Sequence, residues 1–306
     1  MKRKIFALLL VLCLLAGLLS GGRIAVGGQT DPEGLRIAPT VLVDVPEGSP
    51  VLEEEIFGPI LPVLLYRSLP ELVEAAQWFV TRLNTNGRLL TPELCRRLFE
   101  ASLDSVQVTL YAARREVHNA LVGAEGFDDT VQGIRNAAAA GLIVSVNTPL
   151  CSLNRDYAET LRFVHGLGVR YVTCSGLIPT GSAAGEESRA TRLSQEELTD
   201  ILRQAAETAH GLGMELDFTS PGWLPEEALR DMGLHLIPSC GACLSNMALA
   251  PDGTVLPCQS WLEGPGLGNL LTDDWSGIWD GEPCRRIRAE SAKMEHICQL
   301  RQEGGC

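Results

Sequence analysis

The chain has 306 residues, 45% of them hydrophobic, so it is long enough to form one large α/β domain or two smaller domains, each with a real core. Its 25 basic and 38 acidic residues give a net charge of −13, and only 5% of the residues are aromatic. This composition excludes a broad phosphate-binding surface and a base-stacking platform, and we expect no nucleic-acid partner.

The first 21 residues have the pattern of a targeting segment. Three basic residues at positions 2–4 precede an apolar run over residues 5–19, and small residues follow at 20–22. This order is typical of a secretory signal, and the run is short for a membrane-spanning helix. We predict a signal-peptide-like leader over residues 1–21 and no stable membrane span beyond it. A buried core helix is the alternative.

Residues 22–75 contain two predicted strands, at 35–45 and 60–66. The successive motifs APTVL, EEIFGP and PILPV resemble the C-terminal catalytic region of the aldehyde dehydrogenase family. The resemblance implies that Glu55 holds the nicotinamide ribose of NAD and that Phe57 borders its ring. The nucleophilic cysteine motif, the general-base glutamate and the Gly-rich cofactor turn of that family have no counterpart. We therefore interpret these residues as an aldehyde dehydrogenase-like structural fragment, with an NAD-dependent remnant as the least favoured alternative.

Helices and strands alternate from residue 69 to residue 218, which predicts a parallel α/β sheet. The predicted helices are 69–79, 91–102, 130–140, 156–167 and 194–211, and the predicted strands are 80–83, 105–111, 142–148, 170–177 and 214–218. Ligands of such sheets bind at the carboxyl ends of the strands. Asn86, Asn147, Pro179 and Gly181 lie at or near these ends and are candidate binding residues.

The motifs TNG, VQVTLY, VNTPLCSLN and YVTCSGLIPTGSA follow one another from about residue 81. In this order they resemble the later strands of the radical S-adenosylmethionine (SAM) enzymes. The resemblance implies an incomplete (β/α) barrel over residues 76–236. It also implies S-adenosylmethionine as a cofactor, with the four strand-end residues above on its side of the sheet.

Six of the ten cysteines lie in the last quarter of the chain, starting with a C-x2-C pair at Cys240 and Cys243. This spacing is typical of metal or iron–sulfur ligands, while disulfides and buried core thiols are the alternatives. The stretch 237–306 resembles the SPASM/twitch auxiliary-cluster domain of radical SAM enzymes. The resemblance assigns four ligands to a [4Fe–4S] cluster, with Cys240 or Cys284 as possible substitutes and zinc as the alternative metal: Cys243, Cys258, Cys298 and Cys306.

One motif of the radical SAM enzymes is missing from this sequence. Those enzymes hold their SAM-binding cluster on C-x3-C-x2-C, and none of the ten cysteines falls into that pattern. The family role is radical modification of a peptide or a small molecule. We expect this chain to be impaired in that role. The alternative function is a non-catalytic metal-binding module that acts with a protein partner.

The remaining candidates are isolated side chains. We expect His118 to contact the backbone rather than to act as a base, and Cys151 and Cys174 to pack as small hydrophobic residues. The compartment is left open, because an iron–sulfur protein belongs in the reducing cytoplasm, whereas the leader predicts a secreted or membrane-associated protein.

Overall fold

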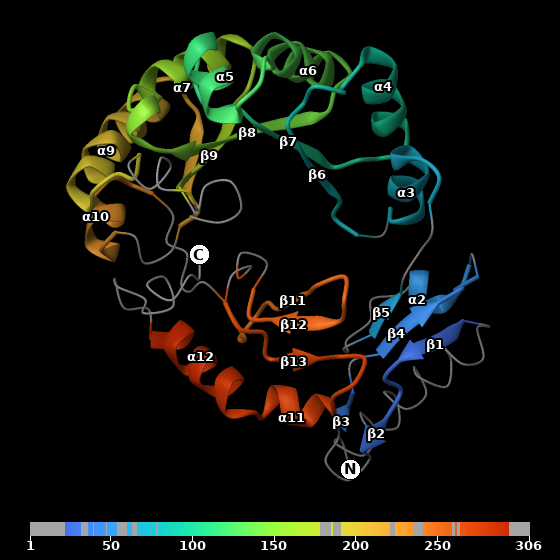
Figure 1. The fold of residues 1–306 in the computed structure, drawn as a ribbon. Helices are drawn as coiled ribbons and strands as arrows, with labels where there is room; N and C mark the ends of the chain where they lie inside the picture. The colour runs from blue at the N-terminus through green and yellow to red at the C-terminus, as the bar shows by residue number, and fades with distance from the viewer. Residues whose placement is uncertain are drawn as a thin grey trace.

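The computed structural model describes three folded parts, which Figure 1 places around a common centre. They are an N-terminal sheet, a five-stranded sheet covered by helices, and a C-terminal unit of short strands and two helices. The described residues are 22–31, 36–38, 40–46, 48–53, 60–62, 66–77, 79–177, 185, 191–220, 224–234, 241–258, 261 and 264–293.

The N-terminal part is a small sheet of three strands in the order β1-β4-β5. The central strand β4 runs antiparallel to β1 and parallel to β5, and Leu42, Val51 and Leu52 form a separate small core beneath it. The elements of this part are β1 (Arg23–Val26), β2 (Thr30–Asp31), β3 (Arg36–Ile37), β4 (Thr40–Val43), α2 (Pro50–Glu53) and β5 (Ile60–Pro62).

The central part is a parallel sheet in the order β10-β9-β8-β7-β6, which confirms the predicted α/β class. Each strand neighbours the next one along the chain, and the helices cover the outer side of the curved sheet (Figure 1). We call this part the half-barrel. Its strands are β6 (Arg82–Thr85), β7 (Ser105–Thr109), β8 (Ile143–Leu150), β9 (Tyr171–Gly176) and β10 (Glu215–Phe218), and its helices are α3 (Leu69–Ala75), α4 (Pro92–Glu100), α5 (Arg115–Val122), α6 (Phe127–Ala139), α7 (Tyr157–Gly166), α9 (Gln195–Gly211) and α10 (Glu226–Asp231).

Alternate residues of the half-barrel strands face opposite sides, as strand geometry requires. Val106, Val108 and Val146 are at most 1% exposed and join one hydrophobic core with helix residues such as Ile134 and Leu202. The residues between them are only partly buried and face away from the helices. The half-barrel therefore has an apolar outer face under the helices and a second, concave inner face.

Local signals explain where most helices begin. Thr91 accepts a hydrogen bond from Leu94 N–H at 3.2 Å, and Pro92 occupies the first helical position of α4. Ser194 and Glu197 form a reciprocal capping box at the start of α9. Helix α5 lay outside the predicted helices because its N-cap, Arg114, makes no side-chain capping hydrogen bond.

Two glycines allow α6 to approach the end of β6 closely. Gly87 has φ +78°, and a Cβ atom on Gly133 would lie 2.0 Å from the carbonyl oxygen of Gly87. Only glycine at position 133 accommodates that backbone, so the TNG turn after β6 is held against α6.

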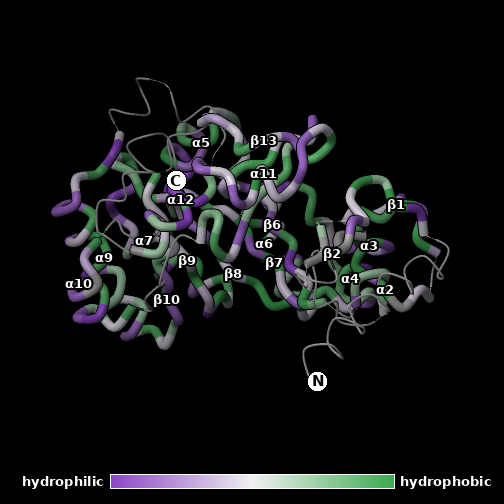
Figure 2. Tube along the Cα trace, turned by 90° about the horizontal axis from the view of Figure 1, so that it is seen from below, coloured by the Kyte–Doolittle hydropathy of each residue, from purple (hydrophilic) through white to green (hydrophobic). Residues whose placement is uncertain are grey.

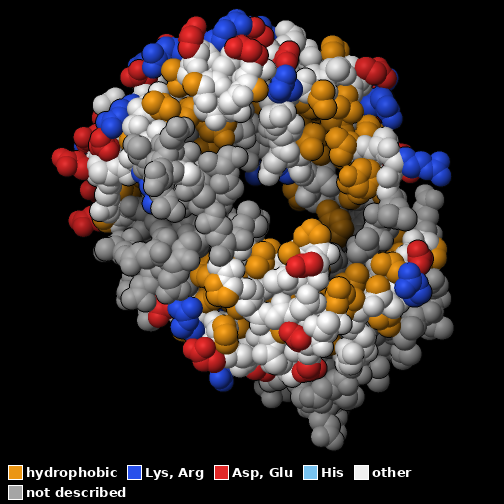
Figure 3. All heavy atoms as spheres, viewed as in Figure 1, with side chains coloured by type: hydrophobic (Ala, Val, Ile, Leu, Met, Phe, Trp, Pro, Cys, Tyr) orange, Lys and Arg blue, Asp and Glu red, His pale blue; other side chains and the backbone are white. Residues whose placement is uncertain are grey.

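The C-terminal part consists of a small antiparallel sheet, β11-β12-β13, followed by two helices. Figure 1 places it opposite the concave face of the half-barrel, and Figure 3 shows a hollow at the centre of the molecule between the two. Its elements are β11 (Ala248–Leu249), β12 (Thr254–Leu256), β13 (Gly268–Asn269), α11 (Trp275–Trp279) and α12 (Glu282–Lys293).

Hydrophobic and hydrophilic residues alternate along the elements of all three parts (Figure 2). Among the described residues, no helix combines the length and the apolar character that a membrane crossing requires.

Candidate metal centre

Three free cysteines of the C-terminal part share one small core. Cys243, Cys258 and Cys284 are 0%, 6% and 0% exposed, and they pack together with Ala242, Trp261 and Ile287. They come from three separate segments: a loop, the bend that follows β12 and the helix α12. We call these three residues the thiol cluster.

The loop that carries Cys243 is fixed by its own backbone. Cys243 adopts a left-handed conformation with φ +54°, and its N–H lies 3.1 Å from the carbonyl oxygens of both Asn246 and Pro257. Pro257 directly precedes Cys258, so this shared hydrogen bond ties the two cysteine-bearing segments together.

Residues 251–253 form the turn of the hairpin between β11 and β12. Asp252 Oδ1 accepts a hydrogen bond from Thr254 N–H at 3.0 Å, and Gly253 has the positive φ of +88° that the turn requires. Asn269 of β13 donates its side-chain amide to the carbonyl oxygen of Asp252 at 2.9 Å. These contacts make the hairpin a rigid support for Cys258 at its far end.

Arg288 connects α12 to this support. Its Nε donates to the carbonyl oxygen of Cys243 at 2.8 Å, and its Nη2 lies 3.2 Å from the sulfur of Cys284 and 3.1 Å from the carbonyl oxygen of Trp279. The guanidinium also stacks 3.7 Å from the centre of the Trp279 ring. Arg288 thereby contacts both cysteine-bearing elements at once.

The surroundings of Cys243 favour its neutral thiol. Burial raises the pKa of the Cys243 thiol to about 12, and the neighbouring sulfurs of Cys284 and Cys258 act in the same direction, while Arg288 opposes them. A metal ion must therefore displace protons to bind here, so its affinity depends on pH.

The chemistry of these donors fits a metal–sulfur centre, since thiolates are the protein ligands of iron–sulfur clusters and of structural zinc. Within the described parts of the chain, however, no three His, Cys, Asp or Glu side chains are arranged around a single ion position. A single ion bound by three of these thiols would need them to move, whereas the thiolates of a [4Fe–4S] cluster bind different irons and need not converge on one point. Cys240, Cys298 and Cys306 lie outside the described residues.

Of the strand-end candidates, Asn86 and Asn147 are described. Asn86 is exposed just beyond β6, where its Oδ1 accepts from Arg88 N–H at 3.2 Å and its carbonyl oxygen accepts from Thr130 Oγ1 at 2.9 Å. Asn147 lies within β8, three residues before the strand ends. Pro179 and Gly181 lie outside the described residues. The structure thus places the two asparagines toward the carboxyl ends of β6 and β8, two strands that β7 separates in the sheet.

The inner face of the half-barrel carries a polar network that joins the predicted candidate Asn147 to Gln107 and Thr173, two residues that the sequence analysis did not single out. Gln107 Nε2 donates to Thr173 Oγ1 at 3.3 Å, and Thr173 Oγ1 donates to Asn147 Oδ1 at 2.8 Å. Gln107, Asn147 and Thr173 lie on the inner face of three adjacent strands, and the side chains of each strand face that side at every second residue. A search of the predicted strands for polar residues at this spacing would have found them.

The isolated candidates have structural surroundings. His118 on α5 is 2% exposed, and its Nδ1 accepts a hydrogen bond from Tyr111 N–H at 3.2 Å, which confirms the expected backbone contact. Burial lowers the pKa of this imidazole. Cys151 and Cys174 are buried as expected, at 1% and 0% exposure. The two aldehyde dehydrogenase-like positions, Glu55 and Phe57, lie outside the described residues.

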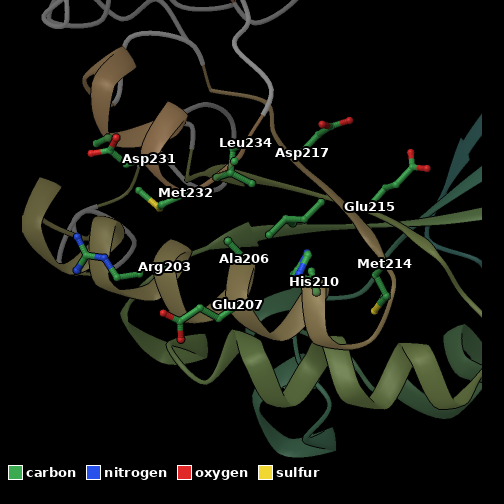
Figure 4. A pocket seen from close by; sticks show the side chains of 14 residues that line it. Arg203, Ala206, Glu207, His210, Met214, Glu215, Asp217, Asp231, Met232 and Leu234 are labelled. Atoms are coloured by element: carbon green, nitrogen blue, oxygen red, sulfur yellow. The ribbon is translucent and has the colours of Figure 1, made fainter.

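A cavity of about 810 Å³ lies elsewhere, between α9, β10 and α10 (Figure 4). It presents the carboxylates of Glu207, Glu215, Asp217 and Asp231 together with Arg203, and it contains no residue that the motifs singled out. It is therefore separate from both the thiol cluster and the strand-end asparagines.

The fold and the cysteine-rich region define a class of protein, a partial parallel α/β barrel followed by a thiol-bearing domain. Comparison with known families makes this specific. Residues 59–164 match the model of the Radical SAM superfamily, and residues 240–302 match the model of an iron–sulfur cluster-binding domain, SPASM. Residues 15–83 match the aldehyde dehydrogenase family. The chain thus carries an aldehyde dehydrogenase segment, a radical SAM region and a SPASM domain in this order, as the motifs predicted, although the first two matches begin earlier in the chain and overlap.

The aldehyde dehydrogenase similarity is high but short. Aldehyde dehydrogenase family 3 member B1 of Mus musculus is 62% identical over 60 residues, which is 20% of this chain and 13% of that protein. The corresponding protein of Homo sapiens is 58% identical over the same length, also 13% of that protein. The chain spans only about an eighth of these relatives.

Solved structures with a similar fold cover most of the chain. SuiB of Streptococcus suis bound to its precursor peptide SuiA aligns with a TM-score of 0.57 and 16% identity, covering 78% of this chain and 57% of that one. The native anSMEcpe with bound AdoMet aligns with a TM-score of 0.51 and 14% identity, covering 77% and 69%. At such low identity the similarity establishes the fold. This chain spans less than two thirds of SuiB.

Proposed function

We propose that this chain is an iron–sulfur protein of the radical SAM/SPASM type that binds one auxiliary [4Fe–4S] cluster through its C-terminal thiols. The observation that carries the proposal is the thiol cluster itself. Three buried free cysteines from separate elements share one core inside the region that matches the cluster-binding model. Their number and burial suit a centre protected from solvent.

The radical step is proposed to be impaired in this chain. In the family, a C-x3-C-x2-C motif holds the cluster that cleaves S-adenosylmethionine. Among the ten cysteines, only Cys240 and Cys243 lie within four residues of each other, so the chain itself offers no ligand set of that spacing. The protein would bind its auxiliary cluster without generating a 5′-deoxyadenosyl radical.

The proposed substrate class of an intact relative is a peptide rather than another small molecule. SuiB was solved with a precursor peptide, and anSMEcpe was solved with AdoMet and the Kp18Cys peptide. The inner face of the half-barrel supports this choice, because Gln107, Asn147 and Thr173 carry amide and hydroxyl groups that match the donors and acceptors of a peptide backbone.

Anaerobic reconstitution tests both parts of the proposal. Protein incubated with ferrous iron and sulfide under reducing conditions should bind about four irons and four sulfides per chain. After addition of S-adenosylmethionine and dithionite, 5′-deoxyadenosine should stay at the level of a protein-free control. Absence of bound iron contradicts the cluster, and accumulation of 5′-deoxyadenosine contradicts the impairment. Stoichiometric zinc in place of iron identifies the chain as a zinc-stabilised module.

We also propose the reducing cytoplasm as the compartment, because free buried thiols and a labile cluster persist there. Recovery of the expressed protein in a soluble cytoplasmic fraction with an uncleaved N-terminus is the expected result. Removal of residues 1–21 by a signal peptidase would overturn this assignment.

A further inference from the structure

The half-barrel sheet ends at β10, and one edge of this strand is open. β10 pairs in parallel with β9, and none of the described strands pairs with its other edge. Glu215 N–H donates to the carbonyl oxygen of Arg170 at 2.8 Å, so this position bonds toward β9. Leu216 and Phe218 alternate with it and direct their N–H and C=O groups to the other edge. Such a row of backbone donors and acceptors is a template for a further strand.

The cavity between α9, β10 and α10 lies along this open edge, since residues 214–217 line it. Its floor is apolar, because Leu216 and Leu234 are only 8% and 7% exposed and Met214 and Met232 line it as well. A volume of about 810 Å³ is large enough to receive several side chains of a bound segment. We call the cavity and the open edge of the strand together the β10 groove.

The rim of the β10 groove is acidic. The guanidinium of Arg203 on α9 lies 3.4 Å from the carboxylate of Asp200, which does not line the cavity. Because carboxylates outnumber guanidinium groups, the groove attracts a cationic occupant. A second copy of this chain is disfavoured, since pairing of two β10 edges would bring like charges together. The carboxylates come from α9, β10 and α10: Glu207, Glu215, Asp217 and Asp231.

The two sides of β10 differ in chemistry. Leu216 is buried against the helices, whereas Glu215 and Asp217 project from the strand away from Met232 and Leu234 (Figure 4). A strand added beside β10 would place every second side chain over the apolar floor and the side chains between them next to the two carboxylates. The groove therefore fits a segment in which apolar and basic residues alternate.

We propose that the β10 groove binds an extended segment of a partner protein, in which Lys or Arg alternates with Val, Ile or Leu, as an added strand of the sheet. In this mode of recognition, main-chain hydrogen bonds supply affinity and alternate side chains supply selectivity. The binding involves neither the thiol cluster nor a bound metal, so it is independent of the proposed function.

Synthetic peptides titrated against the full-length chain test the chemistry of the occupant. The probe is a fluorescently labelled peptide of alternating lysine and valine. Fluorescence anisotropy should show that it binds at least about tenfold more tightly than a peptide of alternating glutamate and valine. It should exceed by a similar factor a peptide of the same composition whose lysines and valines form separate blocks. Equal binding of the block peptide would mean that charge alone holds the probe, and would overturn the strand assignment.

The main-chain hydrogen bonds can be tested by N-methylation of the probe. Methyl groups on the valine nitrogens and on the lysine nitrogens block opposite edges of an extended peptide. One of these two peptides should lose about tenfold in affinity, because its methyl groups face β10, and the other should lose little. Hydrogen exchange should also show added protection at residues 214–218 and none in β6 at the far edge of the sheet. No loss for either peptide contradicts strand addition.

Charge reversal tests the location of the site. Glu207 and Glu215 are exposed, so Glu207→Lys combined with Glu215→Lys alters the rim without opening the core. This variant should bind the probe about tenfold more weakly than wild type. The matched control combines Glu74→Lys with Glu159→Lys, which makes the same change in net charge at exposed positions of α3 and α7 outside the cavity. It should stay within about twofold of wild type at physiological salt, where distant charges are screened.

The remaining outcomes decide the inference. If the two double variants bind the probe equally, the peptide binds elsewhere on the acidic surface and the inference is wrong. If the chain alone forms dimers at rising concentration with protection gained in β10, the occupant is a second copy and the inference is also wrong. Circular dichroism shows whether the variants fold as wild type does, and if the groove variant does not, the peptide series with the unaltered chain decides.

None of these measurements requires a bound metal. Absence of iron from the reconstituted protein would therefore contradict the proposed function while leaving the β10 groove untouched. Conversely, loss of peptide binding would leave the iron–sulfur assignment as it stands.

Discussion

The half-barrel and the C-terminal part each bury three described free cysteines, but in different surroundings. In the half-barrel, Cys95 and Cys174 lie singly among aliphatic side chains of one extensive core. In the C-terminal part, the three thiols make up half of a core of six buried residues. Burial alone therefore does not distinguish a cysteine that only packs in the core from a candidate metal ligand, whereas packing against other buried thiols does.

The same contrast applies to the source of stability. The half-barrel has a contiguous core between its sheet and helices, while the C-terminal part has few apolar residues to stabilise it. Small domains with limited cores commonly depend on a metal or on cross-links. We therefore expect the two parts to respond differently to the same perturbations.

The largest expected effect comes from metal removal. Stripping the reconstituted protein with a chelator should abolish hydrogen-exchange protection in α12 and the β11–β12 hairpin, because structural metals contribute on the order of 10 kcal/mol to small metal-binding domains. Protection of β7 and β8 should not change. Hydrogen exchange followed by mass spectrometry measures both regions at once. Simultaneous loss of protection in both would show that the two parts unfold as one cooperative unit.

A substitution in the core of the half-barrel should instead destabilise the half-barrel and not the C-terminal part. Ile134→Ala on α6 removes a side chain that is 0% exposed and should lower the free energy of unfolding of the half-barrel by about 2–5 kcal/mol. Ile143→Ala is the matched control, because Ile143 is 57% exposed at the start of β8 and should change stability by no more than about 0.5 kcal/mol. Urea unfolding measures both. Equal changes in the free energy of unfolding for the two variants would mean that the side chain of Ile134 on α6 does not contribute to the buried core.

The close approach of α6 to the TNG turn can be tested by adding one methyl group. Gly133→Ala places a Cβ 2.0 Å from the carbonyl oxygen of Gly87 and should destabilise the half-barrel by about 1–3 kcal/mol. Gly166→Ala on α7 meets nothing within 4 Å and should instead stabilise by about 0.4–1 kcal/mol. Opposite signs in thermal unfolding support the geometry, and a neutral Gly133→Ala contradicts it.

The smallest effect is a dependence on alkaline pH. Burial raises the pKa of Cys174 well above its usual range, so the folded state keeps this thiol protonated while the unfolded state loses the proton above about pH 8.5. Stability from this group is fully present below that pH and is lost as the pH rises, at about 1.4 kcal/mol per pH unit.

Cys174→Ala should reduce the slope of unfolding free energy against pH between about pH 9 and pH 10, within the range where the unfolded thiol is ionised. Cys95, whose pKa burial also raises, keeps part of the slope in that variant. Urea titrations at several pH values measure the slope. An unchanged slope would show that the thiol of Cys174 ionises in the folded protein as readily as in the unfolded chain.

The sequence by itself predicted the elements whose signals are local. Helices α4 and α9 begin where Thr91 and Ser194 place capping side chains, at the starts of the predicted helices 91–102 and 194–211. Alternation of these elements predicted the parallel α/β sheet, and the order of motifs predicted the radical SAM and SPASM regions. Caps, turns and periodicity depend on residues a few positions apart, which a sequence displays directly.

Tertiary structure alone decided which side chains meet. Arg288 contacts the carbonyl oxygen of Cys243 across 45 positions of sequence, and Gln107 reaches Thr173 across 66. Such contacts depend on how α12 docks and how the sheet curves, and spacing along the chain carries no record of either. The sequence therefore revealed that cysteines gather near the end of the chain, and the fold brought Cys284 to Cys243 and Cys258.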